Sequence, residues 1–159
     1  MPDHRLGPRG EVLIKSYEKC RLKAYAATAA ERADGIWTIG WGHTKGVTKD
    51  MTCTREQADA WFLEDVDPAV RAVNALGVPL TQSMFDALVS LVFNCGTGCI
   101  RKGSTIGNAL RAHAYHAVLA GFRLWVYQRG QRLPGLERRR REEQALFLAD
   151  GFPSAEEMK

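Results

Sequence analysis

A single glutamate stands where the sequence changes from a helical to an extended pattern. Glu18 follows an apolar stretch from Val12 to Tyr17 and precedes a segment of strand-forming residues. A carboxyl group partly withdrawn from water keeps its proton near neutral pH, as a general acid must. By position alone, Glu18 also fits a solvated glutamate at a helix end. The residue type and its place therefore allow acid catalysis, and the surrounding pattern must decide.

Two further polar side chains lie in a short segment rich in aromatic residues and glycine. Thr38 stands between Trp37 and Ile39, so in a strand it faces away from them, on the same side as Gly40. A hydroxyl at the border of a cleft can hold a water molecule, although threonine is also a common strand residue. His43 follows in a turn, where a hydrogen-bonded structural histidine is the simpler interpretation.

The elements that must position these residues are a short helix and a small hairpin. Residues 10–20 carry Leu13, Tyr17 and Cys20 as an apolar stripe at helical spacing. Residues 22–25 and 36–42 are strand candidates, joined by an irregular hairpin loop. The sequence thus predicts one small β-element directly after the first helix.

The remainder of the chain has helical periodicity. Thr54 and Gln57 form a capping-box pair, and Pro68 is expected to kink or interrupt the helix that follows. Thr81 can cap a helix that is apolar on nearly every side and should therefore be central. Further helices are expected at about 104–113, 115–127 and 134–149.

This order of elements predicts an α+β protein that is mainly helical, and it excludes all-β and doubly wound folds. The 159 residues suit a single domain. Within it we expect a β-lobe at about 21–48 and a helical lobe formed by 1–20 and 49–159. A cleft between two such lobes would fit a polymer.

Composition limits the possible partners. The chain has 22 Lys and Arg against 18 Asp and Glu, so its net charge is +4. This favours an anionic partner, whether nucleic acid, an anionic membrane or a wall polymer. No apolar run reaches the roughly 18 residues of a membrane span, and the first residues lack the apolar region of a signal peptide. The four cysteines show no metal-ligand spacing, so we expect no metal site.

Four blocks of sequence, in order and across nearly the whole chain, resemble the phage-type lysozymes (glycoside hydrolase family twenty-four), most closely the lambdoid branch. They are LIKSYEKCRLKAY at 13–25, WTIGWGHT at 37–44, ALVSLVFNCGTG at 87–98 and RLWVYQRGQRLPGLERRRREEQALF at 123–147. The resemblance implies a lysozyme-like fold, with a small β-hairpin lobe and a larger helical lobe flanking a cleft. It implies muramidase activity with no metal or organic cofactor.

The resemblance also assigns roles. Glu18 matches the catalytic general acid, Thr38 the threonine that positions the attacking water, and His43 a structural histidine of the active site. The family's third catalytic position, an Asp or Cys nine residues after the glutamate, falls on Ala27. A methyl group can neither ionise nor accept a proton.

Three interpretations of Ala27 remain open. Asp34 or Glu31 in the lengthened loop can take the role of the missing carboxylate. The alanine can mark a deliberately inactivated variant. The protein can be a lytic transglycosylase, which needs only Glu18 because a hydroxyl of the sugar attacks intramolecularly.

The function that follows is hydrolysis of the β-1,4 bond between N-acetylmuramic acid and N-acetylglucosamine in peptidoglycan, for host lysis. We expect a monomer without a nucleic-acid partner. It would wait in the host cytoplasm until a holin opens the membrane and then reach the periplasm and cell wall. The alternative from another class is a non-catalytic protein on a lysozyme scaffold that binds the wall or nucleic acid. The run Arg138–Arg141 is typical of a solvated helix face, although the resemblance also allows one of its arginines to pair with Glu18 or line the cleft.

Overall fold

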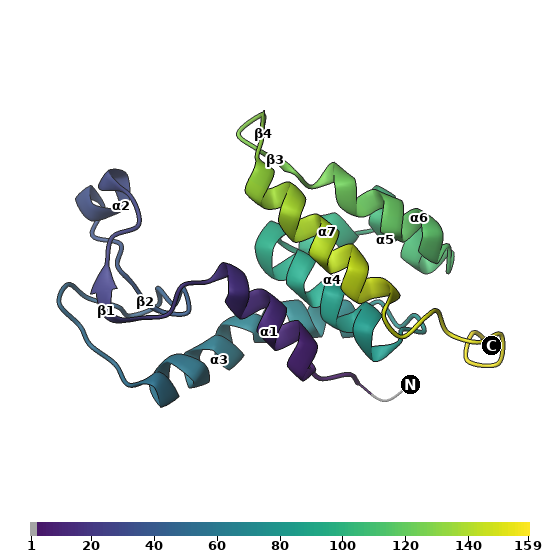
Figure 1. The fold of residues 1–159 in the computed structure, drawn as a ribbon, viewed down its shortest axis with the longest axis horizontal. Helices are drawn as coiled ribbons and strands as arrows, with labels where there is room; N and C mark the ends of the chain where they lie inside the picture. Colours follow the sequence, from purple (N-terminus) through teal and green to yellow (C-terminus); the bar gives the residue numbers. More distant parts are fainter. Residues whose placement is uncertain (1–2) are drawn as a thin grey trace. The chain divides into compact units, whose positions relative to one another are not determined.

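The structure, a computed structural model, describes residues 3–159 and divides into two compact units (Figure 1). The hairpin unit comprises Ile14–Pro68. The helical unit comprises the chain up to Leu13 together with Ala69–Lys159. Both boundaries fall inside helices, the first in α1 (Pro8–Tyr17) and the second in α3 (Arg55–Asn74).

The hairpin unit contains the two predicted strands, which pair antiparallel as β1 (Arg21–Tyr25) and β2 (Thr38–Gly40). The prediction that an irregular loop joins the two strands is wrong, because this segment contains a short helix, α2 (Ala29–Ala33). The Thr28 hydroxyl accepts from the Glu31 N–H at 3.1 Å, and the Glu31 carboxylate accepts from the Thr28 N–H at 3.0 Å. This reciprocal cap satisfies two backbone donors and stabilises one helical turn.

The first helix ends earlier than its stripe predicts. α1 stops at Tyr17, so Cys20 lies outside it, and the fully buried residue of its last turns is Ile14. The second strand also ends early, at Gly40, because the chain turns there. Of the kink or interruption expected at Pro68, the interruption is wrong, since α3 continues past this residue. A proline removes only one helical hydrogen bond, and Val66 and Val73 remain buried on either side of it.

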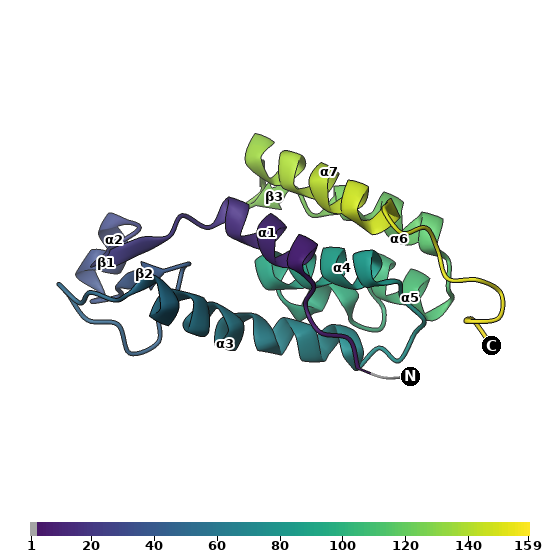
Figure 2. The same ribbon diagram turned by 60° about the horizontal axis from the view of Figure 1, so that its bottom comes forward.

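The helical unit is built around α4 (Gln82–Cys95), which packs against α7 (Pro134–Leu148) (Figure 2). As predicted, Thr81 caps α4, Ser83–Val92 are all buried, and the helix ends at Gly96, whose φ is +81°. A polar tie joins α4 to the start of α1, because the buried Asp86 carboxylate accepts from the Gly7 N–H at 2.8 Å. A negative charge at this end of α1 is also favourable for the helix dipole.

Short elements complete the helical unit. The prediction of a helix at 115–127 is wrong beyond residue 121, where the chain enters a 3-10 turn and then a hairpin. The two residues at the tip of this hairpin, Arg129 and Gly130, both have positive φ. Such a pair of residues closes a tight two-residue turn. The bounds are η1 Thr97–Ile100, α5 Thr105–Arg111, α6 Tyr115–Gly121, η2 Phe122–Leu124, β3 Tyr127–Gln128 and β4 Gln131–Arg132.

Part of the arginine run is buried, which corrects the expectation of a solvated face. The Glu143 carboxylate lies 3.2 Å from Nε of Arg139 and 2.6 Å from Nε of Arg140. It also accepts a hydrogen bond from the Ser90 hydroxyl at 2.6 Å. All three charged residues are at most 3% exposed. A guanidinium can be buried here because a carboxylate on the next turn of the same helix pairs with it.

Glu143→Ala is expected to destabilise the protein by about 3–5 kcal/mol, because it leaves two buried guanidinium groups without their carboxylate. Equilibrium denaturation measures the loss. Glu142→Ala on the same helix is the control, since the Glu142–Arg138 pair is solvent-exposed and should contribute about 1 kcal/mol or less. Equal losses for the two variants would contradict the importance of the buried cluster.

Candidate functional site

Glu18 lies directly after the last residue of α1, in the hairpin unit. Its N–H donates to the Lys15 carbonyl at 3.2 Å, which continues the helical turn by one residue. The side chain is half-buried. The helix end thus places one carboxyl group at the beginning of the β-hairpin, as the sequence predicts.

The turn after β2 lies against the Glu18 carboxylate. Ile39 and His43 exchange both backbone hydrogen bonds at 2.9 Å, which closes a tight turn over residues 40–42. A Cβ atom at Gly42 would lie 3.1 Å from the Glu18 Oε2 atom. Gly42 also has a φ of +95°, a conformation that other residues adopt only with strain. Glycine is therefore required here both for the backbone and for the approach of the carboxylate.

The structure places Thr38 at the first position of β2, opposite Tyr25. The residue is 6% exposed, so it is more enclosed than a freely solvated strand residue would be. Thr38 and Glu18 both belong to the hairpin unit. Glu18 lies just before the first strand of the hairpin, and Thr38 lies at the start of its second strand.

His43 is a buried, paired histidine. Its Nδ1 atom lies 2.9 Å from Oδ2 of Asp65, and its ring stacks on Trp61 with centroids 4.7 Å apart. These contacts tie the end of the turn to α3. In this arrangement His43 positions the backbone of the turn, and the contacts support a structural role for the ring.

A second tie to α3 holds the middle of the turn. The Trp41 Nε1–H donates to Asp59 at 2.7 Å, and the Lys15 ammonium group donates to the same carboxylate at 2.9 Å. Lys15 Nζ also lies 5.0 Å from the centre of the Trp41 ring. Because Lys15 lies in the last turn of α1, just before Glu18, Asp59 connects the end of this helix to the turn that approaches Glu18.

Asp59→Asn should make the stability of the protein less dependent on acid. The hydrogen bond from Lys15, and next that from Trp41, hold the pKa of Asp59 below its ordinary value. A carboxyl group of this kind stabilises the fold above its unfolded pKa of about 4, and the contribution is lost as the pH falls through the folded pKa. The variant should therefore melt at a lower temperature near pH 7, with a difference that shrinks below about pH 4.

Thermal unfolding of both proteins across this pH range measures the effect. Asp34→Asn is the control, because in the part of the chain that is described the Asp34 side chain has no ion pair or hydrogen bond. A melting-temperature difference between Asp59→Asn and the parent that stays constant with pH would contradict the role of the charge on Asp59.

The position that corresponds to the missing carboxylate is on the surface. Ala27 is exposed and lies just before the cap of α2. Of the two carboxylates proposed as substitutes, Glu31 already accepts the Thr28 N–H, which gives it a part in holding the loop. Asp34 is exposed at the C-terminal end of α2. The loop therefore uses one candidate carboxylate for its own structure and presents the other to solvent.

Lys15, Asp59 and Asp65 were missed in the sequence. Asp59 and Asp65 border the buried stripe of Ala58, Phe62 and Val66 on α3. Carboxylates at such a margin are only partly solvated and tend to have partners, which is the signal that was available. Among residues 3–159 no cluster of His, Cys, Asp or Glu is arranged to hold a metal ion. Over the same residues, no helix is both long enough and apolar enough to span a bilayer.

Comparisons with known proteins agree with this arrangement. The sequence model of the family described as "Phage lysozyme" matches residues 15–143. An endolysin of Acyrthosiphon pisum secondary endosymbiont phage 1 is 41% identical, over 89% of this chain and 97% of its own length. The endolysin of Salmonella phage P22 is 37% identical, over 91% and 99% respectively.

A solved structure shows the same fold. The muramidase domain of SpmX from Asticaccaulis excentricus superposes with a TM-score of 0.79 at 37% identity, over 91% of this chain and 98% of that domain. A mutant of P22 lysozyme also superposes, with a TM-score of 0.76 at 36% identity over 91% of this chain and 99% of that one. The mainly helical fold with two small hairpins is thus the phage lysozyme fold, as predicted. The chain belongs to the phage lysozyme family, whose members are endolysin glycosidases that act on peptidoglycan.

Proposed function

We propose that this protein is a muramidase that cleaves the β-1,4 bond between N-acetylmuramic acid and N-acetylglucosamine, with Glu18 as the general acid. The observation that carries the proposal is the close approach of the Glu18 carboxylate to Gly42, which leaves little room for a Cβ atom there. In the same unit, Asp59 connects the last turn of α1 to the turn after β2. Family membership supplies the substrate class. Peptidoglycan carries carboxylates, which a protein of net charge +4 attracts.

In the proposed mechanism, Glu18 donates its proton to the leaving glycosidic oxygen. Positive charge then develops at the anomeric carbon, and a water molecule attacks it. Thr38 helps to hold this water through its hydroxyl, and His43 maintains the backbone of the neighbouring turn through Asp65. The role of general acid requires Glu18 to carry its proton when the substrate is bound.

The group that would activate the attacking water as a general base is not the usual one, since the usual carboxylate is absent. With alanine at position 27, no carboxylate lies where family members have one to assist the water. Asp34 is the better substitute of the two loop carboxylates, because Glu31 is engaged at the helix cap. We therefore propose a slow hydrolase in which Glu18 and Thr38 act with limited help from Asp34.

Thr38→Val should slow hydrolysis while it leaves the fold nearly unchanged. Valine keeps the shape and the strand preference of threonine, but removes the hydroxyl that holds the water. We expect the rate to fall by about tenfold, equivalent to one hydrogen bond of ~1.4 kcal/mol, and the melting temperature to move by only a few degrees. Thr44→Val, at an exposed position after the turn, is the matched control. A large loss of stability without a specific loss of rate would make Thr38 an ordinary strand residue.

The proposal extends to the setting of the reaction. Relatives named endolysins support a role in host lysis, in which the enzyme stays in the host cytoplasm until a holin opens the membrane. It then reaches the periplasm and cell wall and acts as a monomer, without a nucleic-acid partner. No direct contact with the holin is implied.

Clearing of permeabilised Gram-negative cells tests the proposal. The purified protein should lower the turbidity of the suspension, and soluble muropeptides should appear in parallel. Binding to isolated sacculi without release of muropeptides would favour the non-catalytic wall-binding alternative. Binding to DNA with a steep salt dependence, and no clearing, would favour the nucleic-acid alternative.

A further inference from the structure

The basic surplus of this protein is concentrated in one short segment. Residues 123–141 contain seven arginines and one glutamate, a net charge of +6. Since the whole chain carries +4, all other residues together carry −2. The segment comprises the end of η2, the hairpin β3–β4 and the first half of α7, all in the helical unit. The charge is therefore a local feature and not a general surface bias.

Five of these seven arginines are exposed. Arg139 and Arg140 are neutralised in part by Glu143, and Arg132 pairs with Glu137. Within residues 3–159, Arg123, Arg129 and Arg141 have no ion pair or hydrogen bond from their side chains. The exposed arginines are Arg123, Arg129, Arg132, Arg138 and Arg141.

Four arginines line a single hollow between the hairpin and α7. Its volume is about 310 Å³, and Arg123, Arg132, Arg140 and Arg141 contribute to its wall. The Arg140 donors are engaged with Asn94, Trp125 and Glu143, so this side chain forms part of the wall. Arg123 and Arg141 remain available to a ligand. A guanidinium group matches the geometry of a phosphate, which accepts two parallel hydrogen bonds from it.

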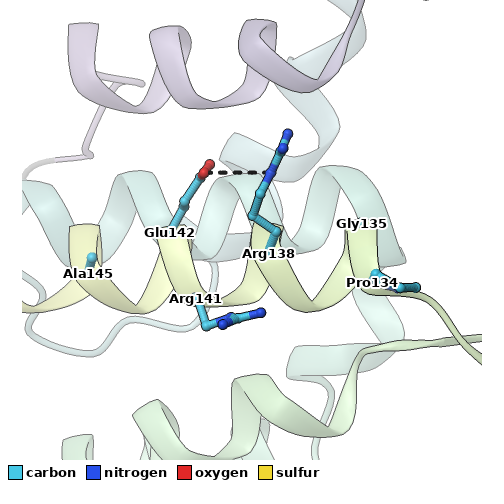
Figure 3. A pocket seen from close by; sticks show the side chains of 6 residues that line it. All are labelled: Pro134, Gly135, Arg138, Arg141, Glu142 and Ala145. Carbon is cyan, nitrogen blue, oxygen red and sulfur yellow. Dashed lines mark ion pairs between the residues drawn. The ribbon is translucent and has the colours of Figure 1, made fainter.

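Arg141 lines two concave regions of the helical unit. The second, of about 620 Å³, runs along the helix and is also lined by Pro134, Arg138, Glu142 and Ala145. Figure 3 shows Arg141 extending from the opposite side of α7 to the Arg138–Glu142 pair. Glu137, one helical turn earlier on α7, lines the same hollow as Arg141 but is paired with Arg132.

Two large apolar side chains stand beside the arginines. Leu124 is 58% exposed and Tyr127 is 60% exposed. Tyr127 is directly opposite Arg132 in the β3–β4 ladder, so both side chains lie on the same face of the hairpin. Leu124 follows Arg123, which lines the hollow. Apolar side chains interleaved with cations are typical of surfaces that bind the interface of an anionic lipid layer.

We propose that the end of η2, the β3–β4 hairpin and the start of α7 form a lipid-binding surface that takes the phosphate of an anionic phospholipid headgroup. Arg123, Arg129 and Arg141 contact phosphates, and Leu124 and Tyr127 enter the interface between headgroups and acyl chains. Exposed apolar side chains favour a lipid layer over duplex nucleic acid, which offers phosphates but no apolar layer to enter.

Sedimentation of the whole chain with vesicles tests this surface. Vesicles of phosphatidylethanolamine with about one quarter phosphatidylglycerol should bind the protein, and vesicles of phosphatidylcholine alone should not. The triple variant Arg123→Gln, Arg129→Gln, Arg141→Gln should bind about 100-fold more weakly, since each basic residue near such a surface contributes about fivefold. Leu124→Ser with Tyr127→Ser should weaken binding about tenfold at unchanged charge.

A charge-matched control separates the surface from net charge. Lys45→Gln, Lys49→Gln and Lys102→Gln remove the same charge from exposed positions outside the segment and should keep binding within a few fold. Equal losses in the two triple variants, or equal binding to phosphatidylcholine, would overturn the proposal. Arginine-dependent binding to duplex DNA, with no effect of the serine changes on vesicle binding, would assign the surface to nucleic acid instead. The vesicles contain no peptidoglycan, so the result is independent of the proposed hydrolysis.

Discussion

Glu18→Gln should lower the rate of peptidoglycan cleavage by about 10²–10⁴-fold, the usual contribution of general acid catalysis. Glutamine has nearly the same shape as glutamic acid, and the space against Gly42 accommodates either. The amide cannot donate a proton to the leaving oxygen. The measurement is the rate of muropeptide release from purified sacculi, at a protein concentration where the parent is active.

The control for this variant is Glu56→Gln. Glu56 is an exposed glutamate in the first turn of α3, in the same unit as Glu18. It should retain the full rate, and both variants should melt within a few degrees of the parent. Release of muropeptides by Glu18→Gln at a rate similar to that of the parent would show that another group is the acid.

Ala27→Asp should raise the hydrolytic rate by about 10²-fold, the lower end of the contribution of a positioned general base. The new carboxylate would stand at the position where family members have their second catalytic residue, and assist the attacking water. Because Ala27 is exposed and next to the N-terminal cap of α2, the change should not disturb packing. Ala27→Asn is the matched control, since it adds the same bulk without the charge and should give no gain.

Asp34→Ala tests whether Asp34 assists the attacking water in the parent protein. If the parent has limited help from Asp34, its removal lowers the parent rate severalfold but has little effect when it is combined with Ala27→Asp. Failure of Ala27→Asp to accelerate hydrolysis, together with loss of activity in Asp34→Ala, would transfer the second catalytic role to the lengthened loop.

The fold was predictable where a pattern is local and repeated. The apolar residues of α4 recur on all sides of one helix, which indicated its central position, and Thr81 and Gly96 marked its ends. The hairpin β3–β4 was missed because its strands are only two residues long and follow a helical pattern without a break. Its signal was the Arg129–Gly130 pair, which the helical periodicity around it obscured.

The site was predictable only in its residue types. Glu18, Thr38 and His43 stood out by their place around the hairpin, but the carboxylates that hold the turn come from α3, at least 16 residues later in the sequence than His43. Such pairs depend on tertiary packing, and no local spacing encodes them. The buried Arg139 and Arg140 show the same limit, since four consecutive arginines give no indication of which of them meet a buried carboxylate.

The chemical form of the new sugar end tests the central claim, that Glu18 acts as the acid while water attacks the anomeric carbon. Mass spectrometry of muropeptides released by the parent chain separates the two possible products, which differ by the mass of one water molecule. Hydrolysis predicts a reducing N-acetylmuramic acid at every new end. Accumulation of 1,6-anhydro-N-acetylmuramic acid would contradict the account and show that a hydroxyl of the sugar, and not water, is the nucleophile.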